Sequence, residues 1–262
     1  MCNAMQNPPS QQQSPIALIT GASRGLGKSM ALHLAATGVD VIITYVKDAQ
    51  AAEEVVAQVQ AKGRNAVALQ LNVANLRSYA EFVSNVRLHL ATWGRERIDY
   101  LVNNAGTGLH ASFATTTEAQ FDDMVNVHLK STFFLTQQML PILNDGGRIL
   151  NVSSGLTRFT FPGYAAYASM KGAVEVLTHY LAQELGARSI TVNTLAPGAI
   201  ETDFGGGAVR DNPQINQALA SQTALGRVGL PDDIGRAVAM LLSPQGGWIN
   251  GQRIEVAGGM LL

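Results

Sequence analysis

The sequence predicts a single doubly wound α/β domain, in which a seven-stranded parallel sheet has helices on both faces. Short apolar runs alternate with longer amphipathic stretches from residue 15 to the end of the 262-residue chain. Each return to a parallel strand requires a helical crossover, so this alternation favours a doubly wound sheet. A glycine-rich turn follows the first apolar run, and no linker, repeat or low-complexity block interrupts residues 15–262.

Strands are predicted at the short apolar runs and helices at the amphipathic stretches between them. The predicted strands cover residues 16–20, 41–45, 66–71, 100–103, 148–152, 191–195 and 253–256. The predicted helices cover residues 25–37, 49–62, 76–91, 117–144, 164–186 and 231–242. Gly38, Gly63 and Gly186 are the predicted helix stops, and three glycines at 205–207 predict a mobile insertion.

The composition narrows the class of partner. Hydrophobic residues make up 47% of the chain, which excludes wholesale disorder. Charged residues make up 14%, against about 25% in typical soluble domains, and this favours an oligomer that hides part of its surface. The net charge of −1 and the lack of any Lys or Arg run argue against nucleic acid and an anionic membrane as partners.

Cysteine and histidine usage argues against a disulfide framework, a thiol nucleophile and a metal site. The single cysteine is Cys2, and the five histidines lack the paired spacing of metal ligands. A reducing compartment, the cytoplasm, is therefore expected. Residues 1–14 predict a disordered N-terminal leader without the features of a signal peptide, and no apolar run approaches the roughly 18 residues needed to cross a bilayer.

The turn after the first predicted strand has the character of a phosphate-binding loop. Gly21, Gly25 and Gly27 have the spacing Gly-x-x-x-Gly-x-Gly, and the segment then enters a predicted helix. Glycines permit a tight turn and let a pyrophosphate approach the backbone N–H groups at a helix N-terminus. A glycine-rich turn alone is weak, but its place between strand and helix predicts a dinucleotide site.

Tyr167 and Lys171 stand four residues apart on a predicted helix, and Ser154 lies thirteen positions before Tyr167. Side chains at i and i+4 share a helix face, so the ammonium is expected beside the phenol. A nearby cation lowers the pKa of a phenol from its usual value of about 10. Alone, this spacing is common on solvated helix surfaces, and its chemical meaning comes from the glycine turn and Ser154.

Taken together, these motifs resemble the short-chain dehydrogenase/reductase family, across residues 15–262. The resemblance rests on the glycine spacing, Ser154, Tyr167, Lys171 and two further motifs, Asn103-Asn104-Ala105-Gly106 and Pro197-Gly198. The C-terminal motifs Gly226-Arg227-Val228-Gly229, Asn250-Gly251-Gln252 and Gly258-Gly259 are similar to the 3-oxoacyl carrier-protein reductase-like branch. The resemblance implies a Rossmann-like fold that binds a nicotinamide dinucleotide.

The resemblance also implies roles for individual residues. Tyr167 would be the general acid, Ser154 would hold the substrate oxygen, and Lys171 would lower the Tyr167 pKa and bind the nicotinamide ribose. Asn126 would position a water in a proton relay to Lys171, with a buried-polar or helix-kink role as its alternative. The implied cofactor-binding residues are Gly21, Ser23, Arg24, Gly25, Leu26, Gly27, Tyr45, Asn72, Val73, Asn104, Ala105, Gly106, Tyr167, Lys171, Pro197, Gly198, Ile200 and Thr202.

Two features favour NADP(H) over NAD(H). The second predicted strand ends at Tyr45 without the acidic residue that would accept hydrogen bonds from a ribose 2′-hydroxyl. Arg24 lies inside the glycine turn, where a guanidinium can pair with a 2′-phosphate. Two departures from the family stand elsewhere: Asn72 replaces an aspartate near the adenine, and Ala257 replaces an aspartate at a position expected to be structural.

The substrate is expected to be a small or medium ketone, aldehyde or diketone in a mainly apolar pocket. That pocket would use the segment after Ser154, the loop 109–113 and a flexible lid at 201–212. Its predicted apolar residues are Leu109, Leu156, Phe159, Phe161 and Phe204. Arg158 is either an anchor for an acidic substrate or a surface residue. Apolar residues on the two long helices favour self-association. The resemblance implies a homotetramer, with a homodimer as the alternative.

The favoured hypothesis is an NADPH-dependent carbonyl reductase without a metal. One alternative is a 3-oxoacyl carrier-protein reductase, which Phe134 and Gln183 disfavour because the family members that bind the carrier present basic residues there. Another is an oxidative dehydrogenase acting on a sugar or secondary alcohol. A third is a catalytically silent NADP(H) sensor or assembly subunit, which would need no proton relay.

Overall fold

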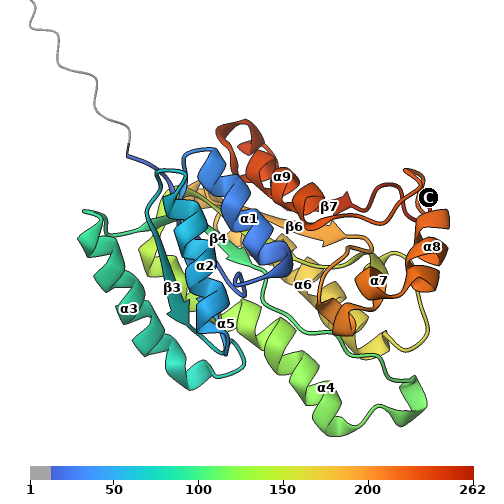
Figure 1. Ribbon diagram of the computed structural model, residues 1–262. Coiled ribbons are helices and arrows are strands. Elements are labelled where there is room, and N and C mark those ends of the chain that lie inside the picture. Colours follow the sequence, from blue (N-terminus) through green and yellow to red (C-terminus); the bar gives the residue numbers. More distant parts are fainter. Residues whose placement is uncertain (1–12) are drawn as a thin grey trace, which may run out of the picture.

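Seven parallel strands form one sheet in the computed structural model, which describes residues 13–262. The strands are β1 Ile16–Ile19, β2 Asp40–Tyr45, β3 Ala66–Gln70, β4 Ile98–Asn103, β5 Leu143–Val152, β6 Thr191–Pro197 and β7 Arg253–Val256. Their order across the sheet is β3-β2-β1-β4-β5-β6-β7 (Figure 1). The predicted fold and its seven strands are confirmed. Residues 1–12 of the predicted leader lie outside the described residues.

The helices return the chain between strands and cover the sheet. They are α1 Gly25–Ala36, α2 Ala49–Gln60, α3 Tyr79–Thr92, α4 Glu118–Met124, α5 Ser131–Met139, α6 Ala165–Glu184, α7 Ala208–Asp211, α8 Pro213–Ser221 and α9 Pro231–Leu242. Figure 1 shows α1 lying between α2 and α9 across one face of the sheet. Sheets of this kind are buried on both faces, which explains why the strand sequences are apolar throughout.

Alternate residues of β1 separate the core into two layers. Ala17 and Ile19 pack with α1, α2 and α9, whereas Ile16 and Leu18 pack with α3, α5 and α6. All four side chains are fully buried. Since successive strand residues point to opposite faces, one four-residue strand contributes to both cores at once.

The helix predicted over residues 117–144 is wrong in its continuity. The segment forms α4, a π-helical stretch at Val125–Lys130, α5 and a short 3₁₀ turn at Leu140–Ile142, and β5 begins at Leu143. In the π stretch the N–H of Ser131 bonds to the carbonyl of Asn126, five residues earlier. Such widened turns recur at functional sites, and no sequence periodicity announces them.

The segment after β6 contains two helices that the sequence analysis missed. Gly205, Gly206 and Gly207 adopt φ values of 62°, 75° and 78°, which residues with side chains rarely adopt. The chain then forms α7 and α8. Asn212 caps α8 by accepting hydrogen bonds from the backbone of the first turn, and Pro213 occupies its first position. The pair Asn-Pro was the available signal for this helix start.

The C-terminal residues pack partly on the domain itself. Met260 is buried and Leu262 is exposed, so the chain end is neither wholly covered nor wholly free. Within residues 13–262, no helix is long and apolar enough to cross a bilayer. The same residues contain no group of three His, Cys, Asp or Glu side chains arranged to hold a metal ion.

Candidate active site

The glycine turn is fixed against the end of β4 by close backbone packing. A Cβ on Gly21, whose φ is 64°, would lie 2.9 Å from the Ala105 Cα, and one on Gly27 would lie 2.5 Å from the Gly21 carbonyl oxygen. The Asn104 amide donates to the carbonyls of Thr20 at 2.8 Å and Gly21 at 3.0 Å. These contacts explain the two glycines and show that Asn104 holds the turn in place.

The turn has the features of an anion site for a dinucleotide. It lies at the carboxyl edge of the sheet between β1 and β4, where the strand order reverses and doubly wound folds bind dinucleotides. Within the described residues, no side chain caps the N-terminus of α1 and no acidic residue lies in its first turn. The N–H groups there can receive a phosphate. The residues present therefore fit a nicotinamide dinucleotide.

Arg24 projects from this turn and is largely exposed. Its Nε lies 3.7 Å from Asp203 Oδ2, and 72% of its side chain is accessible. An ion pair so long and exposed contributes little, so Arg24 can exchange Asp203 for a phosphate. Tyr45, the expected neighbour at the end of β2, is partly buried, and Lys47 beyond it is exposed.

The expected adenine-side residues lie after β3. Asn72 is exposed, and its Oδ1 accepts a hydrogen bond from the Ala74 N–H at 3.0 Å, which closes a local turn. Val73 is buried, and its carbonyl accepts a hydrogen bond from the Tyr79 hydroxyl at 2.6 Å. Asn72 therefore also shapes the loop, and its place in adenine binding stays a prediction.

The expected nicotinamide-side residues follow β6. A Cβ on Gly198 would lie 2.9 Å from the Ala257 Cβ, so Ala257 packs against the backbone at this point, as expected of a structural position. Ile200 forms a bridge to Gly229, and the buried Thr202 lies beside Gly25 of the glycine turn. The loop after β6 thus meets the loop after β1.

Ser154, Tyr167 and Lys171 are brought together at the same edge of the sheet. Ser154 follows β5, and its side chain lies close enough to the Tyr167 phenol to lower the pKa of that phenol. Tyr167 and Lys171 are both buried on one face of α6, one turn apart. The Lys171 Nζ lies 5.7 Å from the centre of the Tyr167 ring and donates to the Val152 carbonyl at 2.7 Å.

Burial sets the direction of the pKa shift for both Tyr167 and Lys171. Burial raises the pKa of Tyr167 above its ordinary value, the Ser154 side chain lowers it, and the nearby Tyr164 raises it. Burial lowers the pKa of Lys171 to about 8. Burial therefore dominates the Tyr167 pKa in the protein by itself, and the lowering of that pKa by Lys171 stays a prediction for the cofactor-bound enzyme. The phenol stays protonated at neutral pH, as a general acid requires.

Two aromatic side chains cover the Tyr167 ring. Phe204, from the segment after β6, lies with its ring centre 5.6 Å away, and the His128 ring packs edge-on at 5.2 Å. Gly108 permits the first contact, since a Cβ there would lie 3.1 Å from the Phe204 ring. His128 was expected to be a surface or packing residue, and the structure gives it a place against the central tyrosine.

Asn126 lies two residues before His128 and is partly exposed. Its backbone carbonyl accepts the π-type hydrogen bond from Ser131, which agrees with the helix-kink role named as its alternative. Residues two positions apart on a helix do not face each other, so Asn126 and His128 cannot both point at Lys171. The relay role of Asn126 stays a prediction.

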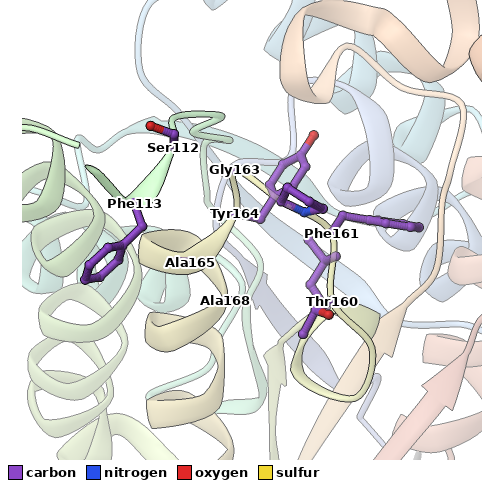
Figure 2. A pocket seen from close by; sticks show the side chains of 10 residues that line it. Ser112, Phe113, Thr160, Phe161, Gly163, Tyr164, Ala165 and Ala168 are labelled. Carbon is purple, nitrogen blue, oxygen red and sulfur yellow. The ribbon is translucent and has the colours of Figure 1, made fainter. Parts of the chain in front are cut away.

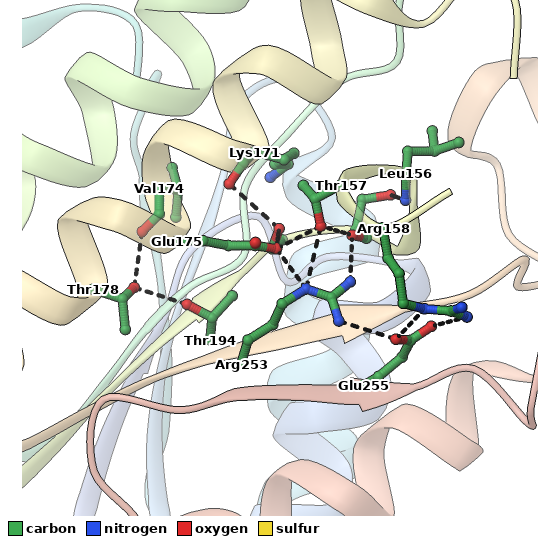
Figure 3. Close-up of polar contacts among 12 residues, drawn as sticks. Leu156, Thr157, Arg158, Lys171, Val174, Glu175, Thr178, Thr194, Arg253 and Glu255 are labelled. Atoms are coloured by element: carbon green, nitrogen blue, oxygen red, sulfur yellow. Dashed lines mark hydrogen bonds and ion pairs between the residues drawn. The ribbon is translucent and has the colours of Figure 1, made fainter. Parts of the chain in front are cut away.

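A network of polar contacts holds the backbone of Ser154 from behind (Figure 3). Glu175 Oε1 accepts from the Ser153 hydroxyl at 2.6 Å, the Thr157 hydroxyl at 2.7 Å and Arg253 Nε at 2.9 Å. Arg253 also donates to the Ser154 carbonyl at 3.3 Å. Glu175 lies one helical turn after Lys171, but no sequence pattern links it to Arg253, so sequence reasoning missed this network.

Arg158 is a surface residue, as one of the two alternatives for it held, and it belongs to an adjoining network. Its guanidinium donates to both carboxylate oxygens of Glu255, at 2.8 and 2.9 Å, and to the Leu261 carbonyl at 2.8 Å (Figure 3). These bonds occupy its planar donor fork. Arg158 ties the loop after β5 to β7 and the chain end, so it is not free to anchor an acidic substrate.

Buried polar side chains connect the strands behind the site to α6. The Asn103 amide donates to Asn151 at 2.8 Å, and the Asn151 amide donates to Thr178 at 2.9 Å. The Thr178 hydroxyl lies 2.8 Å from that of Thr194 on β6. Because buried polar groups are costly unless paired, this ladder fixes the register of β4, β5 and β6 against the helix that carries Tyr167.

An apolar cavity of about 330 Å³ opens beside the first turn of α6. Its walls come from the loop after β4, the loop after β5 and α6 itself. Figure 2 shows Phe113 on one side of that turn and Phe161 with Tyr164 on the other. The lining residues are Ser112, Phe113, Leu156, Thr160, Phe161, Pro162, Gly163, Tyr164, Ala165 and Ala168.

The cavity matches the predicted pocket in part. Leu156 and Phe161 line it, and Leu109 packs with Tyr167 beside it. Phe159 instead packs on Gly155, where a Cβ would lie 2.7 Å from its ring. Phe204 lies on Tyr167 and not in the cavity wall. Phe113, the last residue of the predicted loop 109–113, also lines the cavity, whereas Tyr164 was not among the named pocket residues.

Known proteins resemble this chain over nearly its whole length. Residues 21–261 match the family described as enoyl-(acyl carrier protein) reductase. A tetrahydroxynaphthalene reductase from Pestalotiopsis fici is 37% identical over 267 residues, which cover 96% of this chain and 95% of the relative. A short-chain dehydrogenase/reductase from Pestalotiopsis microspora is 34% identical, covering 99% of this chain and 100% of the relative.

Solved structures agree with this relationship. LugOII, a promiscuous reductase that catalyses keto-reduction at C1 during lugdunomycin biosynthesis, has a TM-score of 0.90 at 37% identity, covering 97% of this chain and all of that chain. The angucycline C-6 ketoreductase LanV, with bound NADP, has a TM-score of 0.89 at 35% identity, covering 94% of this chain and 95% of that one. The chain belongs to the short-chain dehydrogenase/reductase family and is an oxidoreductase.

Proposed function

We propose that this protein is an NADPH-dependent ketoreductase that reduces a ketone carried on a flat, ring-based substrate. The observation that carries the proposal is the meeting of Ser154, Tyr167 and Lys171 next to an apolar cavity lined by aromatic side chains. Relatives named for reduction of tetrahydroxynaphthalene and of angucyclines support the substrate class. The cofactor-bound relatives support NADP(H).

Each side chain has a distinct task in this proposal. Bound NADPH supplies the hydride that becomes attached to the carbonyl carbon. Ser154 donates a hydrogen bond to the carbonyl oxygen and orients it, and Tyr167 transfers its phenolic proton to that oxygen, which yields the alcohol. The Lys171 ammonium stabilises the phenolate left on Tyr167, at a position where water is excluded and charges interact strongly.

The aromatic lining of the cavity supports a ring-based substrate. A volume of about 330 Å³ is at the lower end for small-molecule sites. Phe113, Phe161 and Tyr164 offer faces and edges on which an aromatic ring can pack. This sharpens the expectation of a small or medium ketone, aldehyde or diketone to a bicyclic or larger aryl ketone.

A substrate screen tests the proposal. NADPH oxidation by purified protein would be followed with tetralone, a hydroxynaphthoquinone, cyclohexanone, a short aliphatic ketone and an acetoacetyl thioester. We expect kcat/KM for the bicyclic ketones to exceed that for cyclohexanone by at least about tenfold, because each buried CH₂ contributes roughly 0.8 kcal/mol. Preference for the thioester would favour the carrier-protein alternative. Tight NADPH binding with no turnover of any compound would favour the sensor alternative.

Arg24→Ala tests the cofactor assignment separately. Removing a guanidinium that pairs with a 2′-phosphate should weaken NADPH binding by about tenfold or more, since such charge-assisted bonds contribute roughly 1.5–3 kcal/mol. NADH lacks the phosphate, and its binding should change by less than about twofold. Fluorescence titration of both cofactors measures the two losses. Lys28→Ala, one turn into α1, is the matched control, and equal losses of NADPH and NADH in Arg24→Ala would reject the phosphate role.

The homotetramer or homodimer and the cytoplasmic location remain predictions. Exposed Phe133, Phe134, Tyr180 and Val176 on α5 and α6 support self-association through those helices. Light scattering of the purified protein measures the oligomeric state directly.

A further inference from the structure

His128 is the one buried titratable residue around Tyr167 that the proposed reaction does not use. It lies in the π-helical stretch between α4 and α5 and is 1% exposed. Its ring packs edge-on against Tyr167, with an interplanar angle of 89°. Gly106 makes room for it, because a Cβ there would lie 2.8 Å from His128 Cε1 and 3.3 Å from Nδ1.

The protonation state of His128 follows from its contacts. Burial and then the positive charge of Lys171 lower the pKa of His128 to about 3, so the imidazole is neutral at physiological pH. Its Nε2 lies 2.9 Å from the Thr107 carbonyl oxygen, which can only accept, so Nε2 carries the proton. The remaining nitrogen, Nδ1, is then an acceptor with a free lone pair.

That acceptor is buried without a partner. Within residues 13–262, His128 Nδ1 is one of three buried side-chain atoms with no hydrogen bond. Burying a polar atom is costly unless it is paired, and an unpaired one in a native structure requires an explanation. The titratable groups near the His128 ring are Tyr167 and Lys171, both on α6. Of these, the Lys171 ammonium needs acceptors.

Lys171 has capacity for such a bond. Its ammonium carries three N–H donors, and the Val152 carbonyl takes one of them. Lys171 and His128 lie against the same ring, since the Lys171 Nζ is 5.7 Å and the His128 ring centre 5.2 Å from the centre of the Tyr167 ring. Donation to a water held by a neutral imidazole lone pair stabilises the charged form of a lysine that burial otherwise disfavours.

We propose that His128 is a positioning residue whose Nδ1 accepts a hydrogen bond from one bound water, which in turn accepts a hydrogen bond from the Lys171 ammonium. This bridge keeps Lys171 charged beside Tyr167 and holds the end of the proton path that recharges the phenol. The inference rests on the proposed reductase function and assigns to His128 the contact with Lys171 expected of Asn126.

The test uses three replacements that separate the two ring nitrogens. In His128→Asn the amide oxygen reaches the position of Nδ1, whereas in His128→Gln the amide reaches the position of Nε2 and can bond only to Thr107. His128→Phe keeps the ring packing against Tyr167 and removes both nitrogens. Asn126→Ala, two residues away, distinguishes this assignment from the relay role predicted for Asn126. Thermal unfolding of each variant shows whether the domain remains folded.

The first readout is the ionisation of Lys171 and needs no turnover. The chain has five lysines, so the Lys171 signal in ¹³C-lysine-labelled protein can be assigned by comparison with Lys171→Met. We expect the Lys171 pKa to fall by about one unit in His128→Phe and His128→Gln, a tenfold change in its ionisation constant. It should return toward the wild-type value in His128→Asn and stay unchanged in Asn126→Ala.

The second readout is the pH profile of kcat with the best ketone from the screen. The fall of kcat at high pH should begin about one unit earlier in His128→Phe and His128→Gln, with KM for NADPH within about threefold of wild type. An unchanged Lys171 pKa in His128→Phe, or equal restoration by Gln and Asn, would overturn the proposal. If wild-type protein reduced no ketone, the substrate proposal would fail while the lysine titration still decided the role of His128.

Discussion

Two groups of polar side chains flank the end of β5, and they are satisfied to very different degrees. Behind Ser154, the carboxylate of Glu175 accepts three hydrogen bonds and Arg253 bonds to Glu175, Glu255 and Ser154. In front of it, Tyr167 and Lys171 are buried with pKa values shifted toward their neutral forms. One side of the strand end is a closed network, and the other is a set of groups short of partners.

This difference separates stability from reactivity within one site. A charged network that is fully paired tolerates burial and fixes geometry. A phenol and an ammonium that lack water gain more from a charge that develops between them than they would in solution. The Ser154 hydroxyl belongs to the reactive side and its backbone carbonyl to the structural side, so β5 joins the two.

Tyr167→Phe should have the largest effect, and it should fall on chemistry alone. Loss of a general acid costs about 100- to 10,000-fold in rate, so kcat should fall within that range. NADPH affinity should change by less than about threefold, because the phenol ring and its packing remain. Steady-state kinetics and a fluorescence titration measure the two quantities. If the variant kept wild-type kcat, the assignment of Tyr167 as the acid would be untenable.

In contrast to Tyr167→Phe, Glu175→Gln should lower stability and have a much smaller effect on kcat. Replacing the carboxylate weakens three charge-assisted bonds and leaves Arg253 with less compensation, which should lower the free energy of unfolding by about 1–3 kcal/mol. At temperatures where the variant is folded, kcat should stay within about tenfold of wild type, because Glu175 contacts no reacting atom.

Urea unfolding and kcat, measured on the same preparation, check this prediction. Glu184→Gln provides a control on the exposed surface of the same helix, where a change of less than about 0.5 kcal/mol is expected. A large loss of kcat in Glu175→Gln with unchanged stability would contradict the division between the two sides.

The last expected effect is a pH dependence of stability from Lys171. Its pKa is about 8 when folded and 10.5 ordinarily, so between these values the unfolded chain holds a proton that the folded chain has released. Stability therefore rises with pH in this window, by up to about 1.4 kcal/mol per pH unit. Above pH 10 the raised pKa of Tyr167 acts with the opposite sign, because only the unfolded chain loses that proton.

Unfolding by urea between pH 8 and 10, compared with Lys171→Met, isolates this contribution. The difference in unfolding free energy between the two proteins should change with the slope of about one proton. A difference that stayed constant over this range would mean that Lys171 has an ordinary pKa in the folded protein.

The backbone framework was predictable because its signals are local. Alternating apolar runs placed all seven strands, and the glycine spacing placed the turn after β1. The helix spacing of Tyr167 and Lys171 put them on one face, as the structure shows. Each of these inferences depends on residues within a few positions of one another, where periodicity and steric limits act directly.

Other features could not be derived from neighbouring residues. The π turn places the His128 ring against Tyr167, whereas the sequence had suggested Asn126 as the neighbour of Lys171. No periodicity in the sequence marks this turn. Arg158 is a surface residue, but its pairing with Glu255, nearly a hundred positions away, could not be derived from its neighbours in the sequence. The Tyr167 pKa in the protein by itself could not be derived from the sequence either, because the loss of hydration depends on everything packed around the phenol.

The sequence by itself determined the doubly wound sheet, the family and the identity of the chemical side chains, since these follow from spacing and residue type. The tertiary structure alone decided which groups are paired and which are left short of partners. Glu175 and His128 are both polar residues on helices, and only the packing of distant strands and loops makes one a structural acceptor and the other an unpaired one. Burial and pairing are properties of the whole assembly of elements, and they set the chemistry of Tyr167 and Lys171.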